Sequence, residues 1–404
     1  MEKIAGVIAE YNPFHNGHAY QFEQIRKCGA DAIVVCMSGN FVQRCEPAVL
    51  EKHNRALSAV ENGADLVLEL PFPYSLLSAE GFASAGVHLL SASGVVTDLY
   101  FGCESAKTED LLDAYSALCR AEESGKISQL VKTGLSFPRA RAGAMKSAGA
   151  RFVPEKPNDI LAFEYVKAIF RQKSSLRPVS LPRIGDYLSE APCGEFLSAS
   201  GIRSRLFSGG EISRYLPESS YLRLLSAKKD GTLVKKDALD RLVLSGLIRK
   251  SLFLENRSAE GLENRIFAAM ERCFSEGDRS LDSVCRAAGS KRVALSSVRR
   301  KAYSLFFEIP EPVSPPGYLH VLAFNRRGRE LLRRMKNKAS LPVYHTLPAD
   351  RKRFSLELLS DEIYFLLSGD PSRGINGFTA NSLFFEENGK FFPGTPLQKK
   401  EDLV

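Results

Sequence analysis

The chain has 404 residues, of which 44% are hydrophobic and 25% are charged. This length exceeds what one ordinary hydrophobic core supports, so we expect two or three domains in a soluble globular protein. The formal net charge of +8 is compatible with a polyanionic partner.

The sequence argues against a membrane protein, a secreted protein and a zinc-stabilised fold. Residues 1–3 lead directly into the first predicted strand, which indicates no signal peptide, and no apolar run approaches the length that crosses a bilayer. The eight cysteines are scattered without a C-x-x-C pair, so neither structural zinc nor a disulfide framework is expected. We therefore expect reduced thiols in the cytoplasm, no membrane partner, and we identify no metal ligands.

Strands and helices alternate over the first hundred residues. Strands separated by helices of this length indicate βαβ units and a parallel sheet, whose ligand crevice lies at the carboxyl ends of the strands. The predicted strands are 4–9, 31–37, 65–71 and 97–102, and the predicted helices are 16–27, 47–62 and 78–90.

The turn after the first predicted strand carries two histidines. Pro13 ends the strand because it has no N–H for the ladder, and a helix is predicted from about Asn16. His15 and His18 are three residues apart, so they point to the same side of the first turn. Free N–H groups and the positive end of the helix dipole favour phosphate there, bound by largely neutral rings. The alternative is a histidine pair that only caps the helix.

From residue 108 the pattern is helical, with a small loop-rich insert at 136–156. Another helix is predicted to open at Pro157, where Asn158 or Asp159 is a candidate N-cap, and a strand is predicted at 177–184. Residues 198–203 place hydroxyls before a helix that carries an arginine. Opposite the histidine turn, this segment would be a second helix N-terminus aimed at the same anion.

The second half has a different character. Residues 208–210 are a candidate hinge, amphipathic helices are predicted at 239–252, 261–274 and 291–307, and a short strand at 318–324. We therefore expect a first domain at 1–208 and a mainly helical, basic domain at 209–404. The final thirty or so residues receive no role.

Two basic stretches lie in this second half. Such runs are often solvated faces, but two of them favour RNA binding, which would depend strongly on salt. One stretch comprises Lys291, Arg292, Arg299, Arg300 and Lys301, and the other comprises Arg326, Arg327, Arg329, Arg333, Arg334, Lys336 and Lys338.

The H-x-G-H turn and the later [ST]-x-[ST]-x-x-R helix start together resemble the nucleotidyltransferase superfamily. The resemblance implies an α/β fold with a Rossmann-like parallel sheet, in which both elements bracket a nucleoside triphosphate. Several further motifs in order resemble the tRNA(Met) cytidine acetate ligase family over about the first half of the chain. These motifs lie at 10–18, 38–44, 69–71, 78–82, 101–102, 157–161 and 183–184, with weaker likeness at 318–332.

That resemblance implies ATP-dependent activation of acetate to acetyl-adenylate, then acetyl transfer to the wobble cytidine of elongator tRNA(Met), forming N4-acetylcytidine. Mg²⁺ is expected as the partner of ATP. By resemblance, His15 and His18 hold phosphates, Gly17 lets the backbone come close, Gly102 and Asn158 contact the nucleoside or its ribose, and Arg183 and Arg203 offset phosphate charge. The implied ATP site comprises Val7, Ile8, Ala9, Glu10, Tyr11, Asn12, Pro13, Phe14, His15, Asn16, Gly17, His18, Ala19, Tyr20, Gly102, Asn158, Arg183 and Ile184.

Two positions depart from the family pattern. Cys45 stands where the family usually has glycine, and the tryptophan usual near His53 is missing, since the chain has no tryptophan. If the glycine had a positive φ, Cys45 would be strained; the alternative is a harmless exposed thiol.

Two other functions remain open from the sequence. A small-molecule adenylyltransferase needs only residues 6–18 and 198–203, but leaves the basic second half unexplained. An RNA-binding protein with a non-catalytic nucleotide pocket would bind tRNA without turning over ATP.

Overall fold

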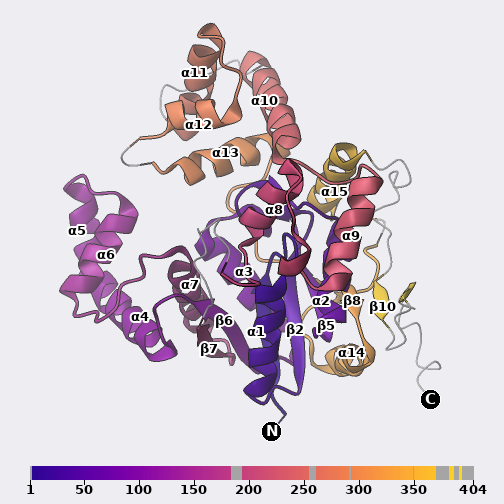
Figure 1. Cartoon of the computed structure of the whole chain (residues 1–404). Helices are drawn as coiled ribbons and strands as arrows, with labels where there is room; N and C mark the ends of the chain where they lie inside the picture. Colours follow the sequence, from indigo (N-terminus) through magenta and orange to yellow (C-terminus); the bar gives the residue numbers. More distant parts are fainter. Residues whose placement is uncertain are drawn as a thin grey trace.

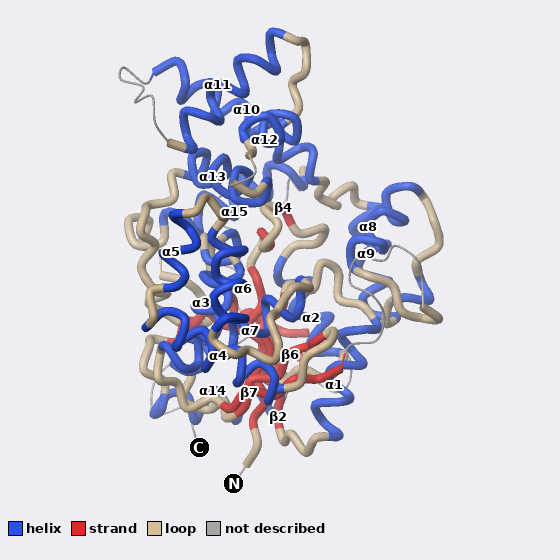
Figure 2. Tube along the Cα trace, turned by 90° about the vertical axis from the view of Figure 1, so that its left-hand side faces the viewer, coloured by secondary structure: helices blue, strands red, loops and turns tan. Residues whose placement is uncertain are grey.

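A mostly parallel β-sheet with helices on both faces forms the centre of the molecule (Figures 1 and 2). The computed structural model describes residues 2–182, 193–253, 261–290, 293–348, 350–369, 382–385 and 391–393. The sheet order is β11-β10-β8-β5-β2-β1-β6-β7, with β9 beside β8. Its strands are β1 (Ile4–Ala9), β2 (Ala32–Ser38), β5 (Leu66–Leu70), β6 (Asp98–Cys103), β7 (Arg177–Pro182), β8 (Leu319–Phe324), β9 (Val343–Tyr344), β10 (Leu383–Phe385) and β11 (Phe391–Pro393).

The parallel part of the sheet contains a topological switch point. The chain runs from β1 through β2 to β5 in one direction, then resumes at β6 on the other side of β1. β1 pairs with β2 through Val7–Val35 and with β6 through Val7–Tyr100, both in parallel register. The carboxyl ends of β1 and β6 therefore flank the position where open α/β sheets bind ligands, and the predicted α/β fold is confirmed.

Both faces of the sheet are covered, which explains why all seven residues of β2 are buried. Val34 and Cys36 pack into one core together with α3, α7 and α14, whereas Ile33 and Val35 pack into a second core with α1 and α2. The helices of the first half are α1 (Asn16–Lys27), α2 (Lys52–Glu61), α3 (Ala79–Ala92), α4 (Thr108–Glu123), α5 (Lys126–Lys132), α6 (Phe137–Ser147), α7 (Pro157–Arg171) and α8 (Ala199–Ser208).

Two first-half predictions were wrong in their boundaries. The helix predicted at 47–62 begins only at Lys52, because β3 (Phe41–Val42) and β4 (Glu46–Pro47) pair as a hairpin just before it. The insert predicted to be loop-rich at 136–156 contains α6, which packs on α4 and α5.

The capping alternative for α7 was also wrong. Lys156 is the N-cap of this helix. Asp159 instead accepts hydrogen bonds from the backbone N–H of Glu104 and from Ser105. This contact ties the start of α7 to the loop after β6.

Much of the second half forms a helical bundle above the sheet (Figure 1). The bundle has its own core, which also receives Phe41 and Cys45 from the hairpin and Phe72 from the loop after β5. The helices of the second half are α9 (Glu218–Lys229), α10 (Lys236–Phe253), α11 (Leu262–Ser275), α12 (Leu281–Ala288), α13 (Leu295–Phe307), α14 (Arg326–Lys338) and α15 (Ser355–Ser368), and the chain has short 3-10 turns at Tyr74–Leu76 and Ser213–Tyr215. The bundle core takes side chains from α10, α11, α12, α13 and α15. The prediction missed α9, α12 and α15.

The chain then returns to the sheet. The strand predicted at 318–324 is confirmed as β8, and it pairs antiparallel with β5. A sequence boundary at 208/209 therefore places β8 and α14 in the second segment although both pack against the first, and the two-domain division stays a prediction.

The described helices include none that is long and apolar enough to cross a membrane. All eight cysteines lie in described parts of the chain and are free thiols.

Candidate active site

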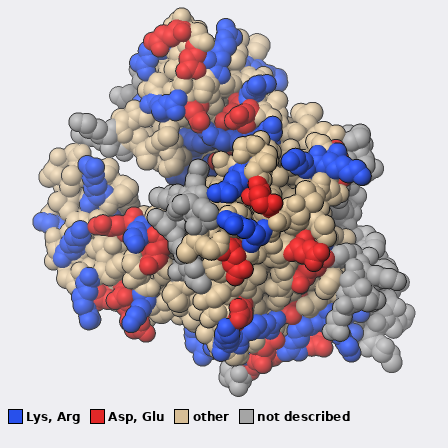
Figure 3. All heavy atoms as spheres, in the orientation of Figure 1, with Lys and Arg blue, Asp and Glu red and all other residues tan. Residues whose placement is uncertain are grey.

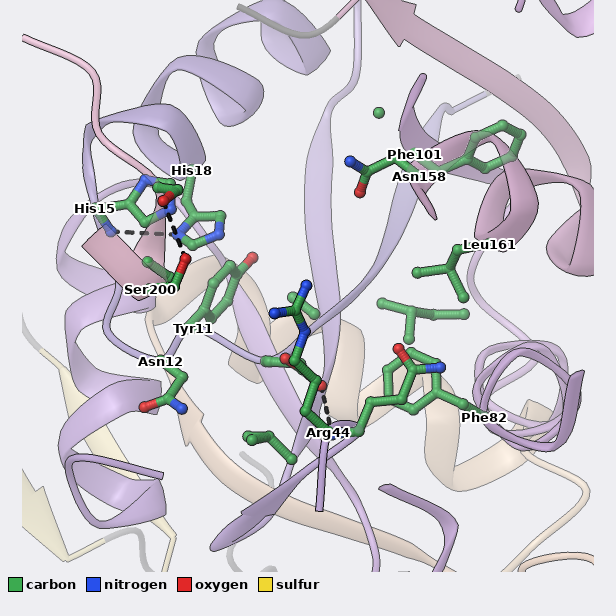
Figure 4. A pocket seen from close by; sticks show the side chains of 18 of the residues that line it. Tyr11, Asn12, His15, His18, Arg44, Phe82, Phe101, Asn158, Leu161 and Ser200 are labelled. Atoms are coloured by element: carbon green, nitrogen blue, oxygen red, sulfur yellow. Dashed lines mark hydrogen bonds between the residues drawn. The ribbon is translucent and has the colours of Figure 1, made fainter. Parts of the chain in front are cut away.

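A pocket opens at the switch point, against the carboxyl ends of β1 and β6 (Figure 4). Its cavity volume is about 170 Å³. His15, His18 and Ser200 lie on one side, Phe101, Asn158 and Leu161 lie opposite, and Arg44 extends between them (Figure 4). The lining residues are Ile8, Ala9, Glu10, Tyr11, Asn12, His15, His18, Gln21, Val42, Gln43, Arg44, Glu46, Phe82, Phe101, Gly102, Asn158, Leu161, Tyr165, Ser198, Ala199, Ser200 and Arg203.

The histidine turn both caps α1 and faces the pocket. Nδ1 of His15 accepts a hydrogen bond from the Gly17 N–H at 3.0 Å, and Nδ1 of His18 accepts one from the His15 N–H at 3.2 Å. The two rings stack with centroids 3.8 Å apart. A neutral imidazole that accepts at Nδ1 carries its proton on Nε2, so both rings have an N–H to donate. Capping and phosphate binding, posed above as alternatives, are therefore compatible.

At Gly17 a side chain would collide with the neighbouring ring of His15. A Cβ at this position would lie 2.9 Å from Cε1 of His15, which is closer than real contacts allow. Glycine thus makes room for the capping ring of His15, and the predicted close approach of a ligand to this backbone stays a prediction. Tyr11, at φ +49, packs its ring edge-on against His18 with centroids 4.7 Å apart.

The start of α8 lies beside the start of α1, as the sequence predicted. Asn16 Nδ2 donates to the backbone oxygens of Glu195 and Arg214 at 3.1 and 2.9 Å, which fixes the segment before α8 onto α1. Ser198 caps α8 by accepting from the Gly201 N–H. Two helix N-termini therefore meet at one wall of the pocket, a favourable arrangement for an anion.

Arg203 reaches the pocket from the second turn of α8. Its guanidinium donates to the Asn12 carbonyl at 2.7 Å and to the Glu46 carboxylate at 3.2 Å. These bonds hold the turn after β1 against the β3–β4 hairpin. The contact of Arg203 with phosphate stays a prediction.

The loop after β2 supplies residues that the site prediction missed. Arg44, exposed at the hairpin tip, projects into the pocket (Figure 4). The Gln43 N–H donates to Glu10 Oε1 at 2.6 Å, and burial raises the pKa of the Glu10 carboxyl. The 38–44 motif, which carried part of the resemblance, was the signal available for these positions.

A buried arginine holds this loop in place. Arg55 is fully buried, and its guanidinium donates to the carbonyl oxygens of Glu10, Ser38 and Gly39. These oxygens lie just after or at the carboxyl ends of β1 and β2. Arg55 thereby fixes the separation of the two loops that line the pocket.

The opposite wall is largely apolar. Gly102, next to the end of β6, and Asn158, in the first turn of α7, line it as predicted. Asn158 Nδ2 donates to the Glu104 carboxylate. Phe82, Phe101, Leu161 and Tyr165 complete this wall; the site prediction did not include them, because buried aromatic and aliphatic residues look like ordinary core in a sequence.

The structure thus brings nine of the eighteen residues of the predicted nucleotide site together around the pocket. Arg183 and Ile184 lie outside the described residues. Val7 and Phe14 are buried in the sheet core instead of lining the pocket. Other predicted residues that do not line it are Pro13, Asn16, Gly17, Ala19 and Tyr20, which belong to the turn and to α1.

The two departures from the family pattern have structural outcomes. Cys45 has φ +55, in the left-handed region that favours glycine, so the condition under which strain is predicted is met. The alternative of an exposed thiol was wrong: Cys45 is 1% exposed, and burial raises its thiol pKa to about 12. His53 is also buried, with Nδ1 2.7 Å from Glu51 Oε1.

In the described part of the chain, no group of three or more His, Cys, Asp or Glu side chains is arranged to hold a metal ion. The pocket instead presents imidazole N–H groups, guanidinium groups and helix N-termini. This set of donors suits a bound anion such as a polyphosphate.

Comparisons with known proteins agree with this chemistry. The family described as HIGH Nucleotidyl Transferase matches residues 2–375. The tRNA(Met) cytidine acetate ligase of Acetivibrio thermocellus is 34% identical over 406 residues, covering 92% of this chain and 96% of that protein. The ligase of Clostridium kluyveri is 35% identical, covering 91% and 95%.

A solved structure is similar over nearly the whole chain. The crystal structure of Thermotoga maritima TmcAL bound with alpha-thio ATP superimposes with a TM-score of 0.81 and 30% identity, covering 95% of this chain and all of that one. The chain therefore belongs to the HIGH nucleotidyl transferase family and, within it, to the tRNA(Met) cytidine acetate ligases.

Proposed function

We propose that this protein activates acetate with ATP to acetyl-adenylate and transfers the acetyl group to the wobble cytidine of elongator tRNA(Met), forming N4-acetylcytidine. The observation that carries the proposal is the pocket at the β1/β6 switch point, where two helix N-termini, two imidazole N–H groups and Arg44 converge. The ATP analogue bound to the similar Thermotoga maritima protein supports ATP as the nucleotide.

The chemistry has two displacement steps. An acetate oxygen attacks the α-phosphorus of ATP, and the bond to the bridging oxygen breaks as pyrophosphate leaves. The exocyclic amine of cytidine then attacks the acetyl carbonyl, AMP leaves, and the amine loses a proton. Both steps need positioning and charge neutralisation rather than a covalent nucleophile.

The pocket divides these tasks between its walls. His15 and His18 would donate from Nε2 to phosphate oxygens, next to the N–H groups at the starts of α1 and α8. Arg44 would offset phosphate charge from the hairpin side. Loss of one charge-assisted contact of this kind costs about 1.5–3 kcal/mol of binding. The apolar wall with Gly102 and Asn158 would hold the nucleoside.

Mg²⁺ is proposed as the partner of the ATP phosphates, to neutralise their charge. The carboxylates of Glu10 and Glu46 line the pocket. Mg²⁺ is usually bound by one or two carboxylates together with substrate phosphates. We also propose a cytoplasmic location, because the proposed acceptor is a tRNA.

The test measures ATP–pyrophosphate exchange with and without acetate, and then transfer of labelled acetate to tRNA(Met). We expect exchange that requires acetate, and label on tRNA(Met) only when ATP is present. Absence of acetate-dependent exchange would contradict the proposal. Release of a stable dinucleotide-like product without tRNA would instead support a small-molecule adenylyltransferase, and tRNA binding without ATP turnover would support a non-catalytic RNA-binding protein.

A further inference from the structure

A second, larger cavity adjoins the nucleotide pocket. Its volume is about 620 Å³, and it shares Gln43, Arg44, Glu46, Asn158 and Leu161 with the first. The β3–β4 hairpin and the start of α7 therefore form a common wall. The rest of the lining comes from Cys45, Ala79 and Pro157 and, on the helical bundle, from Lys236, Asp282, Arg286, Leu295, Ser296, Arg299 and Arg300.

The bundle side of this cavity has an excess of positive charge, because four basic side chains line it together with one acidic side chain, that of Asp282. Asp282 pairs with Lys236 at 3.3 Å and with Arg299 at 2.5 Å. Arg286 and Arg300 bond only to hydroxyls in the described structure, at 2.9 Å to Ser283 and 3.3 Å to Ser296. Neither forms an ion pair with a described carboxylate, so both guanidinium groups are available to an anion.

Arg300 is partly withdrawn from solvent, which favours pairing of its guanidinium with an anion. The side chain is partly buried between the bundle and the hairpin, and desolvation lowers its pKa. A guanidinium placed there without an acid partner carries a desolvation cost that an incoming anion would offset. Figure 3 shows basic side chains gathered along the lower edge of the bundle, where it meets the sheet.

The other basic stretch, on α14, has a different setting. The Asn325 N–H that precedes α14 donates to the Asp65 carbonyl, just before β5, so the helix begins at the amino edge of the parallel strands. Arg327 and Arg334 both pair with Glu2, and Arg327 also pairs with Glu330. This surface is remote from the carboxyl edge, where the pocket lies, and part of its charge is already neutralised.

We propose that the cavity between the hairpin, α7 and the α12–α13 face is the RNA entry site, with Arg286 and Arg300 binding phosphates of the strand that delivers the target cytidine. RNA is the occupant that this geometry favours, because the cavity adjoins the pocket where the acceptor must react and shares lining residues with it. The proposal rests on the proposed function and assigns the α14 stretch no part in binding.

The test compares Arg286→Gln, Arg300→Gln and the double variant with the matched double variant Arg333→Gln/Lys336→Gln on α14, whose two side chains are exposed. Acetyl transfer is measured against tRNA(Met) concentration at several salt concentrations. Each cavity substitution should raise the KM for tRNA about tenfold and lower the magnitude of the salt slope by roughly 0.7–0.9. The α14 variant should match the unsubstituted protein.

Acetate-dependent ATP–pyrophosphate exchange separates this inference from the proposed function. Exchange needs no tRNA, so the cavity variants should retain it, which also shows that they fold. An unchanged KM and salt slope in the cavity double variant, or their loss in the α14 variant, would overturn the inference while leaving the function standing. Loss of exchange in the cavity variants would also overturn it, by placing these arginines in the ATP site. If the unsubstituted protein exchanges no pyrophosphate, the proposed function fails, and tRNA binding across salt concentrations still decides between the two surfaces.

Discussion

Two polar clusters are neighbours at the carboxyl edge of the sheet, and they differ in how their charges are satisfied. In the first, which we call the buried charge cluster, Lys52 Nζ lies 3.0 Å from Glu69 Oε1 and 2.7 Å from Asp361 Oδ2, and His320 Nδ1 lies 2.5 Å from Glu69 Oε2. All four residues are at most 6% exposed. The second is the nucleotide pocket, whose donors face a cavity.

The loop after β2 connects the two clusters. Asn40 donates to Asp361 and accepts from the Lys52 N–H, both at 2.8 Å. A Cβ on Gly39 would collide with Glu69 Oε1, so only glycine allows the loop to approach the cluster this closely. The buried ion pairs of Lys52 hold the loop in place. The donors of the neighbouring nucleotide pocket instead face a cavity that a ligand can enter. Substitutions should therefore separate stability from activity.

Breaking the buried charge cluster should have the largest effect. Lys52→Met leaves the carboxylates of Glu69 and Asp361 without their ammonium partner, and loss of one partner from a buried pair costs about 3–5 kcal/mol. Urea unfolding should report this loss. Lys27→Met is the matched control, because Lys27 makes an exposed pair with Glu23 and should cost little. Equal unfolding midpoints for the two variants would contradict this role of the cluster.

Removing a hydrogen-bond donor from the nucleotide pocket should lower activity much more than stability. His18→Ala deletes an N–H aimed at the phosphates, and loss of one preorganised donor lowers a rate by about 100-fold or more. We expect that loss in acetate-dependent exchange, whereas the lost capping bond from the His15 N–H should lower the free energy of unfolding by only about 1 kcal/mol, less than Lys52→Met does. His88→Ala is the control, since His88 contacts the Pro316 carbonyl away from the pocket. Exchange that survives His18→Ala would remove this histidine from the ATP site.

A pH dependence of stability should arise near the buried cluster. Burial lowers the pKa of His345 to about 4 from 6.5, so the unfolded chain binds its proton more tightly than the folded chain does. Stability from this group is therefore complete above about pH 6.5 and declines as the pH falls toward 4, by about 1–2 kcal/mol at pH 5. Urea midpoints at pH 5 and 7 measure the difference. His345→Gln should reduce it, and an unchanged pH dependence would contradict the assignment.

The smallest effect is expected at Cys45, where the usual order of glycine and alanine should reverse. At φ +55 a side chain costs about 1 kcal/mol that glycine does not. Cys45→Gly should therefore be more stable than Cys45→Ala by about that amount in urea. The buried thiol should also resist alkylation in the folded protein. A more stable alanine variant would show that the left-handed conformation carries no strain.

Local patterns predicted the parts of the fold that depend on neighbouring residues. The alternation of apolar strands and helices indicated β1, β2, β5 and β6, and the spacing of His15 and His18 located the pocket. The serine and arginine start of α8 was also predicted to face the same pocket, but it lies beside the histidine turn rather than opposite it. These features are encoded within a few residues of one another.

Contacts between distant residues were not predictable in the same way. Asn40 and Asp361 are 321 positions apart, and no local pattern indicates that α15 returns beneath the loop after β2. Likewise β8 reads as a short apolar strand, but its antiparallel pairing with β5 depends on the intervening helical bundle. Arg44 was missed as a site residue because its direction depends on the turn of the hairpin.

Mass analysis of the nucleosides of tRNA(Met), after incubation with the protein, ATP and acetate, tests the central claim most directly. We predict N4-acetylcytidine that requires both ATP and acetate and is strongly reduced by His18→Ala. Unmodified cytidine in the presence of all components would contradict it.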